Sequence, residues 1–242
     1  MIKVREEIHT DQYLACERRL VFELLMMTAG MMGAYTFNLR GGVFSNAQTA
    51  NIVLMSIAFG KGDIKHGLYY LIPISAYLLG SILSEILPKP VKKVRLFRWD
   101  TILMFLEIII LFIIGFIPTT ISHHVVQIMI NFTCAMQHNT FRQAESIPMA
   151  TTMCTNHLRQ VGVWFVKYFK NRDTKSLIRE KSHVVMIGCF FLGGLFETVA
   201  CIFLDEKAIW LALIPLAINL FMLIRADLVD EKNDLEKVPL GH

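Results

Sequence analysis

The chain has 242 residues, of which 54% are hydrophobic and 18% are charged, and its formal net charge is +4. With a mean hydropathy of +0.49, this composition is typical of an integral membrane protein and leaves no room for a separate soluble domain. The basic residues flank hydrophobic segments, so topology explains the positive charge better than nucleic-acid binding does. We therefore expect a single all-α membrane domain over residues 1–242, with the lipid bilayer as its partner.

Taken in chain order, the apolar stretches predict six membrane-spanning helices, because a bilayer core about 30 Å thick needs roughly 20 apolar residues per helix. The predicted spans are 20–38, 66–87, 99–117, 121–137, 183–204 and 208–224. Two further segments, 45–59 and 148–166, are shorter or more polar, and each follows a span through a broken connection. The first sixteen residues contain no apolar core, so no cleavable signal peptide is predicted.

Two basic clusters predict the orientation, since short cytoplasmic loops are enriched in Lys and Arg. The clusters are Lys89, Lys92, Lys93, Arg95 and Arg98, and then Lys167, Lys170, Arg172, Lys175, Arg179 and Lys181. They fall on the same side, together with the N-terminus, only if 45–59 and 148–166 do not cross. This predicts six spans with cytoplasmic tails at 1–17 and 226–242, although Lys61 and Lys65 then lie on the outer side and count against it.

The two halves of the chain repeat one architecture, with a first repeat at 18–117 and a second at 118–225. Residues 43–51 (VFSNAQTAN) align with residues 149–157 (MATTMCTNH), which pairs Thr49 with Thr155. Three crossings in each half make the second repeat inverted relative to the first. Inverted repeats with interrupted helices are a recurring plan of transporters and channels, whose solute sites lie where the interruptions meet.

The interruptions also predict the site, because irregular backbone at membrane depth must be buried in protein or line a wet cavity. The two short helices would direct their N-termini toward the centre and favour an anion or an electronegative oxygen. The predicted solute-binding residues are Thr49, Asn51, Asn139, Arg142, Thr155, Asn156 and His157. The transporter hypothesis predicts that Thr49 and Thr155 face one central polar cavity. The alternative is that these side chains only satisfy the broken backbone.

Glutamates within apolar spans are further candidates, because a charge there costs about 2.5 to 3.5 kcal/mol. Glu197 is the deepest and is predicted to couple protons, although pairing with a neighbouring helix is the alternative. Arg142 could pair with an anion or with a glutamate, and the alternative is that it marks the cytoplasmic boundary. The five cysteines form no CxxC pair and are predicted to be free thiols. No metal, cofactor or catalytic residue is expected, since HExxH, GxSxG and Walker A spacings are missing.

At the broken connections the sequence resembles the YoaK family of bacterial inner-membrane proteins, a family of unknown function. The motifs are GGVF at 41–44, TAN at 49–51, QHNTFR at 137–142 and TNHLR at 155–159. Ala50 and Asn156 stand where the family pattern has glycine, and His157 stands where it has asparagine. The resemblance covers about 18–225. It implies an uncharacterised six-span protein of the bacterial inner membrane.

These observations favour a small secondary transporter or channel for a small polar or anionic solute. The alternative is a non-transporting scaffold or sensor that binds a lipid or a protein partner, and a third hypothesis is an intramembrane enzyme. Exposed helix faces would also allow a homodimer. Measured solute flux separates the first class from the other two.

Overall fold

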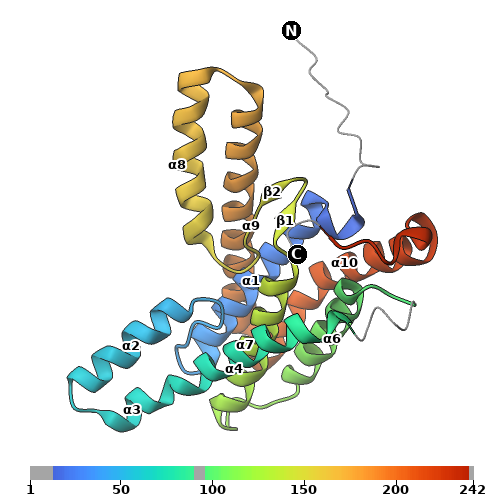
Figure 1. Cartoon of the computed structure of the whole chain (residues 1–242). Helices are drawn as coiled ribbons and strands as arrows, with labels where there is room; N and C mark the ends of the chain where they lie inside the picture. Colours follow the sequence, from blue (N-terminus) through green and yellow to red (C-terminus); the bar gives the residue numbers. More distant parts are fainter. Residues whose placement is uncertain (1–12, 90–95, 240–242) are drawn as a thin grey trace.

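The computed structural model describes residues 13–89 and 96–239, and most of them lie in helices (Figure 1). The basic residues Lys92, Lys93 and Arg95 therefore lie outside the described residues, as do parts of both predicted tails. The first half contains α1 (Arg19–Leu39), α2 (Gln48–Gly60), α3 (Ile64–Tyr69), α4 (Leu71–Ile86) and α6 (Trp99–Ile114). The second half contains α7 (His123–Thr140), α8 (Cys154–Asn171), α9 (Thr174–Leu204) and α10 (Leu213–Arg225).

Short elements connect or terminate these helices. Before α1 lies the 3-10 turn η2 (Ala15–Glu17), and η3 (Asp205–Ala212) joins α9 to α10. A hairpin of β1 (Gln143–Ala144) and β2 (Ile147–Pro148) follows α7. The C-terminal part contains the π turn η4 (Ala226–Asp230) and the 3-10 turn η5 (Lys232–Asp234).

Among the described residues, three helical stretches are long and apolar enough to cross a membrane. They are Arg19–Leu39, Ile64–Ile86 and Thr174–Asp230. The first two correspond to the predicted spans 20–38 and 66–87. The third contains both 183–204 and 208–224, because η3 continues helically from α9 into α10. The chain is thus a helical protein whose apolar helices are compatible with a membrane.

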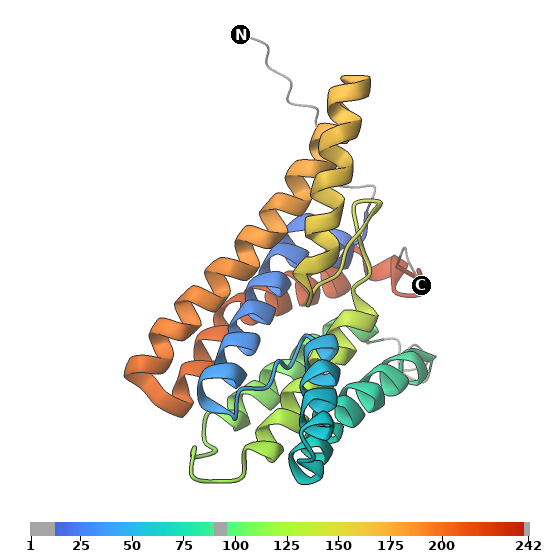
Figure 2. The same ribbon diagram turned by 90° about the vertical axis from the view of Figure 1, so that its left-hand side faces the viewer.

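Two long helix pairs form the centre, and each pair joins one helix from each half of the chain. Helix α1 packs against α9, and α4 packs against α7 (Figure 2). Both pairs are parallel: along α1 and α9, Gly30 lies beside Phe190 and Asn38 bonds Thr198. Along α4 and α7, Gly80 lies beside Phe132. Nearer the C-terminal ends of both helices, Ser84 and Asn139 form a 2.9 Å bond.

Glycines allow the backbones of these pairs to approach closely, as small residues do at helix interfaces in membranes. A Cβ atom on Gly193 of α9 would lie 2.0 Å from the carbonyl oxygen of Met27 in α1. A Cβ atom on Gly80 of α4 would lie 2.5 Å from the carbonyl oxygen of Phe132 in α7. Both crossings therefore require a residue without a side chain.

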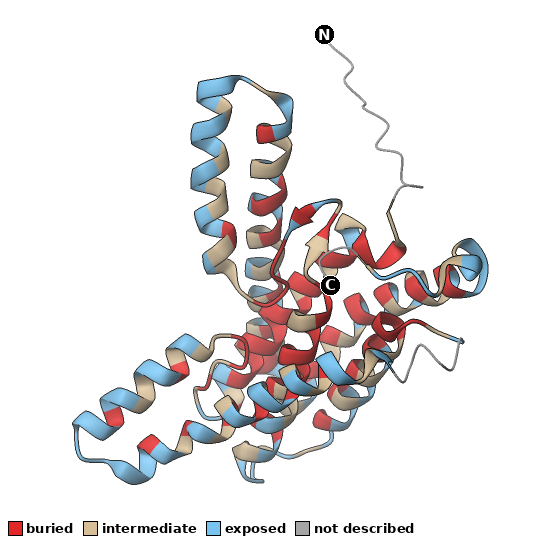
Figure 3. Ribbon diagram, viewed as in Figure 1, coloured by how far each residue is buried: buried red, intermediate tan, exposed pale blue. Residues whose placement is uncertain are grey.

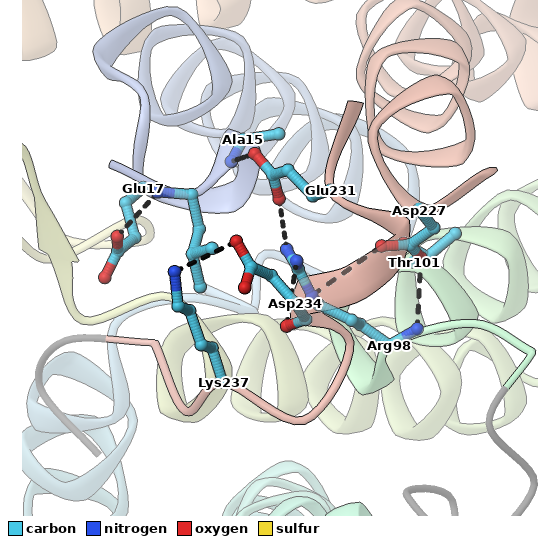
Figure 4. A network of polar contacts seen from close by, with 9 residues as sticks. Ala15, Glu17, Arg98, Thr101, Asp227, Glu231, Asp234 and Lys237 are labelled. Atoms are coloured by element: carbon cyan, nitrogen blue, oxygen red, sulfur yellow. Dashed lines mark hydrogen bonds and ion pairs between the residues drawn. The ribbon is translucent and has the colours of Figure 1, made fainter. Parts of the chain in front are cut away.

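At one end of the molecule, a polar network ties α6 to the N- and C-terminal segments (Figure 4). Arg98 lies before α6 and forms ion pairs with Asp227 and Glu231, and Asp227 also accepts a 2.7 Å bond from Thr101. Glu231 in turn accepts a 2.7 Å bond from the backbone N–H of Ala15. Largely buried ion pairs therefore hold the start of α6 against the C-terminal segment at this end of the protein.

Burial is highest where the long helix pairs meet and falls along two projecting helix hairpins (Figure 3). One hairpin is formed by α2 and α3, and the other by α8 and the first part of α9 (Figure 1). The two hairpins project from different sides of the central helices.

The predicted helix at 148–166 differs from the structure. Pro148 lies in β2, and the helix begins six residues later at Cys154. Pro148 instead ends the β1–β2 hairpin, whose turn binds the start of α1: Glu145 accepts bonds from the backbone and guanidinium of Arg19 at 3.1 and 3.2 Å. The other short helix, predicted at 45–59, is close to α2.

Candidate functional site

The first broken connection, residues 40–47, folds back from the end of α1 into the protein. Arg40 is fully buried; its guanidinium donates to the Tyr35 hydroxyl and to the carbonyls of Ile117 and Pro118. Ser45 lies 3.3 Å from the Thr36 hydroxyl, and both side chains are fully buried. The connection is therefore held at depth by polar contacts to α1 and to the end of α6, as irregular backbone among apolar helices requires.

Asn51, the fourth residue of α2, ties the start of this helix to the first connection. Its side-chain amide donates 2.9 Å to the carbonyl of Phe44, seven residues earlier, and 3.1 Å to Gln48. Gln48 donates 2.7 Å to Asn131 of α7, and Asn131 donates to the carbonyl of Gln127. Hydrogen bonds between side-chain amides thus link α2 to α7.

The second connection repeats this arrangement with different residue types. His157 is the fourth residue of α8, and its Nε2–H donates 2.7 Å to the carbonyl of Ala150, again seven residues earlier. Thr151 lies three residues before α8, as Ser45 lies three residues before α2, and both are fully buried. The alignment of 43–51 with 149–157 therefore pairs residues that lie at the same positions in the two connections.

Unlike Asn51, His157 has a titratable partner. Its Nδ1 lies 2.9 Å from Nδ1 of His183 in α9, and both side chains are buried. Because His157 Nε2 donates to a carbonyl, Nδ1 of a neutral His157 accepts the proton carried by Nδ1 of His183. The Nε2 of His183 is then an acceptor, and it is buried without a hydrogen-bond partner. Burial lowers the pKa of His157, while its bond to Ala150 raises it to a smaller extent.

The two connections approach the same stretch of α7. Gln48, the residue that follows the first connection, donates 2.7 Å to the Asn131 side chain. Six residues further along α7, the Gln137 amide donates 3.3 Å to the carbonyl of Thr151 in the second connection. Gln137 Nε2 also lies 3.5 Å from the carbonyl of Leu25 in α1. Polar groups from both connections therefore meet between α1 and α7.

The structure places the predicted threonines differently from the sequence hypothesis. Thr49 and Thr155 are exposed, so the expectation that they face one central cavity is wrong. The reason is helical geometry: at 3.6 residues per turn, positions two apart point to nearly opposite sides. Because Asn51 and His157 face inward, Thr49 and Thr155 face outward. Asn156 is half-buried and accepts a 3.0 Å bond from Arg159 at the same surface.

Asn139 and Arg142 lie together at the end of α7, away from Asn51. Arg142 donates to the Asn139 side chain at 2.6 Å and forms a 3.1 Å ion pair with Glu85. Of the alternatives open for Arg142, the structure shows the pairing with a glutamate. Arg142 and Glu85 line a cavity of about 220 Å³, together with Trp99 and Val238.

Two buried glutamates lie within the apolar helices. Glu197 of α9 and Glu107 of α6 are fully buried, and no carboxylate oxygen of either has a hydrogen-bond partner. An unpaired buried carboxylate is costly, so both side chains are suited to carry a proton.

The amides of α7 are functional candidates that the sequence reasoning missed. Gln127, Asn131 and Gln137 are all fully buried in a helix with many apolar residues. Their spacing of four and then six residues could have indicated a polar stripe facing the protein interior. The five cysteines are free thiols, as predicted.

No curated protein and no solved structure matches this chain. Residues 21–222 match the family described as "Protein of unknown function (DUF1275)". This match covers α1 to nearly the end of α10, so it includes both broken connections. The chain therefore belongs to the DUF1275 family of proteins of unknown function.

Proposed function

We propose that this protein is a small six-span secondary transporter for a small polar or anionic solute, and a YoaK-type member of its family. In this proposal the inward-facing Asn51 and His157 contribute to the site, and the outward-facing Thr49 and Thr155 do not. The observation that carries the proposal is the meeting of both broken connections on α7, where Gln48 bonds Asn131 and Gln137 bonds the carbonyl of Thr151. Ser45, Asn51, Thr151 and His157 supply the polar groups around this point. Solute sites of transporters with interrupted helices lie at such meeting points.

The arrangement of helices supports an inverted repeat. In each half the first crossing helix packs in parallel with the second crossing helix of the other half, α1 with α9 and α7 with α4. The third crossing helices of the two halves, α6 and α10, are antiparallel, since Thr101 near the start of α6 bonds Asp227 after α10. Trp210 before α10 bonds the carbonyl of Phe112 near the end of α6. Six crossings with both tails on one side account for these directions.

Proton coupling by Glu197 is the second part of the proposal. A carboxyl group without a hydrogen-bond partner in an apolar helix binds a proton readily, and its ionisation requires a compensating charge or a rearrangement. Glu197 precedes Thr198, whose hydroxyl accepts a 3.3 Å bond from Asn38 near the end of α1, just before the first connection. Protonation of Glu197 can therefore affect the end of α1 that leads into that connection.

Flux into proteoliposomes tests the proposal. The purified chain is reconstituted and assayed with a panel of anions and small neutral solutes, with and without a pH gradient. The wild type should move at least one solute, and Asn51→Ala and His157→Ala should reduce its flux about tenfold or more. Glu197→Gln should abolish the response to the pH gradient. Flux that is unchanged in all three variants would exclude the proposed site.

The exposed neighbours provide matched controls. Thr49→Ala lies two residues from Asn51 on the same helix, and Thr155→Ala lies two residues from His157. Both should keep the flux of the wild type. If no solute in the panel moves while the protein remains folded, the non-transporting alternative, a scaffold or sensor for a lipid or a protein, becomes the better hypothesis.

A further inference from the structure

The buried amides around the two connections share an orientation that restricts the solute they can bind. In Asn51, Gln127 and Gln137 the side-chain nitrogen donates to a backbone carbonyl. The accepting carbonyls belong to Phe44, Arg40 and Thr151, respectively. Because a carbonyl oxygen only accepts, the nitrogen of each amide, and not its oxygen, must face it. The backbone therefore fixes the orientation of all three amides.

The oxygen of each of these amides is buried and has no hydrogen-bond partner among the described residues. The three atoms are Asn51 Oδ1, Gln127 Oε1 and Gln137 Oε1, and we call them the amide acceptors. In the second connection, the hydroxyls of Thr151 and Thr152 are also buried and unpaired. A buried acceptor without a donor is unfavourable, so a ligand that supplies the donor is stabilised there.

Unpaired donors lie elsewhere in the described part of the chain. The buried N–H groups of this kind are the Nε atoms of Arg18, Arg19 and Arg98, at the starts of α1 and α6. The other unpaired nitrogens belong to histidines, which accept as well as donate. In the first connection, the buried guanidinium of Arg40 directs four N–H groups to a hydroxyl and two carbonyls. The two connections thus offer a solute acceptors, while the donors of Arg40 are largely used.

We infer that the solute is neutral and rich in N–H or O–H donors, and that it is not an anion. This inference rests on the proposed transport function and names the solute class that the same site accepts. An anion offers only acceptors, so it would face the amide acceptors with repulsion and without a hydrogen bond. A cation would be repelled by the guanidinium of Arg40, whose described hydrogen-bond partners are neutral. Ureas, amides and small polyols have the required chemistry.

Three planar solutes of similar shape test this inference in the reconstituted protein. Urea is neutral and carries N–H donors, guanidinium is a cation that carries N–H donors, and nitrate is an anion that carries none. Uptake is compared with that of protein-free liposomes, and potassium with valinomycin holds the membrane potential at zero. Urea should enter faster than nitrate by about tenfold or more, the difference expected for one unpaired buried acceptor. Guanidinium should enter more slowly than urea.

Substitution of the amides tests whether their oxygens cause this selectivity. Gln127→Leu and Gln137→Leu each remove one acceptor, at different positions along α7, with little change in side-chain size. Each should reduce the uptake of urea by about fivefold, as expected for one lost hydrogen bond, without raising that of nitrate. Gln160→Leu makes the same change on α8, outside both connections, and should leave uptake unchanged. Circular dichroism of the same samples reports whether each variant is folded.

The possible outcomes separate this inference from the transport function on which it rests. Uptake of nitrate without urea would overturn the inference and leave the protein a transporter of anions, and uptake of guanidinium alone would overturn it in favour of a cation. Uptake of urea that both α7 variants leave unchanged would also overturn it. If none of the three solutes enters, the wider panel decides: a donor-rich neutral solute supports the inference, and an anion overturns it. The absence of any flux would remove the inference together with the proposed function.

Discussion

The two broken connections share their geometry and differ in their chemistry. In each, the fourth residue of the following helix is buried and donates to a carbonyl seven residues earlier: Asn51 to Phe44 at 2.9 Å, and His157 to Ala150 at 2.7 Å. The first connection is surrounded by the amides of α7, whereas the second contains a pair of histidines. One backbone arrangement is thus stabilised once by groups that do not titrate and once by groups that do.

This difference indicates that the two halves respond differently to pH. Amide groups such as Gln48 and Asn131 keep the same donors and acceptors at every physiological pH. The pair of His157 and His183 shares one proton between two Nδ1 atoms, so a second proton would break the contact. The second half is therefore the half whose connection can respond to pH.

The largest expected effect is on the helix crossings that the halves share. Gly193→Ala places a Cβ atom 2.0 Å from the Met27 carbonyl, and neither backbone can yield without separating α1 from α9. We expect a loss of about 3 kcal/mol or more in unfolding free energy, at the upper end for overpacking. The measurement is reversible unfolding in mixed detergent micelles, followed by circular dichroism.

Two further glycines show whether this loss is due to the crossing. Gly188→Ala lies on the same helix with no atom within 4 Å, so it should leave stability unchanged or raise it by up to about 1 kcal/mol. Gly80→Ala, at the crossing of α4 and α7, should destabilise like Gly193→Ala but less, because its closest contact is 2.5 Å. Equal effects at Gly188 and Gly193 would contradict the close approach of α1 and α9.

Truncation of Asn51 or His157 should lower the free energy of unfolding by an intermediate amount. Asn51→Ala and His157→Ala each leave a buried carbonyl without its donor, which costs about 1–3 kcal/mol. If the connections are equivalent, the two losses should agree within about 1 kcal/mol under the unfolding conditions used for the glycines. His157→Asn should recover most of the loss, since an asparagine makes the corresponding bond in the first half. A loss confined to one connection would show that the halves differ in geometry as well.

The sequence predicted the apolar helices and the alignment of the connections, but not which side chains face inward. Hydropathy identifies α1 and α4 because lipid-facing and buried residues are both apolar, so the prediction does not depend on packing. Thr49 was a candidate because it is polar, whereas its orientation depends on where α2 begins. Arg40 gave no signal, since its burial depends on carbonyls at 117 and 118, which are distant in the chain.

The same limit applies to the second connection. The β1–β2 hairpin could not be foreseen from 143–148, because its turn is stabilised by Arg19, more than 120 residues earlier. Hydropathy also could not find the partner of His157, since His183 lies on another helix. Contacts between distant segments decide these features, and a single sequence does not contain them.

The smallest expected effect is a pH dependence of stability that is confined to the second half. Burial lowers the pKa of His157 below its ordinary value of about 6.5, so the unfolded chain binds this proton first as the pH falls. Between the two pKa values the unfolded state holds more protons, and stability therefore decreases with falling pH, by at most about 1.4 kcal/mol per pH unit for one group. The contribution is fully present above pH 7. Unfolding at pH 8, 7 and 6 should show this slope in the wild type and in Asn51→Ala, and a smaller slope in His157→Asn. An identical slope in His157→Asn would assign the pH dependence to other groups and would remove the proposed difference between the halves.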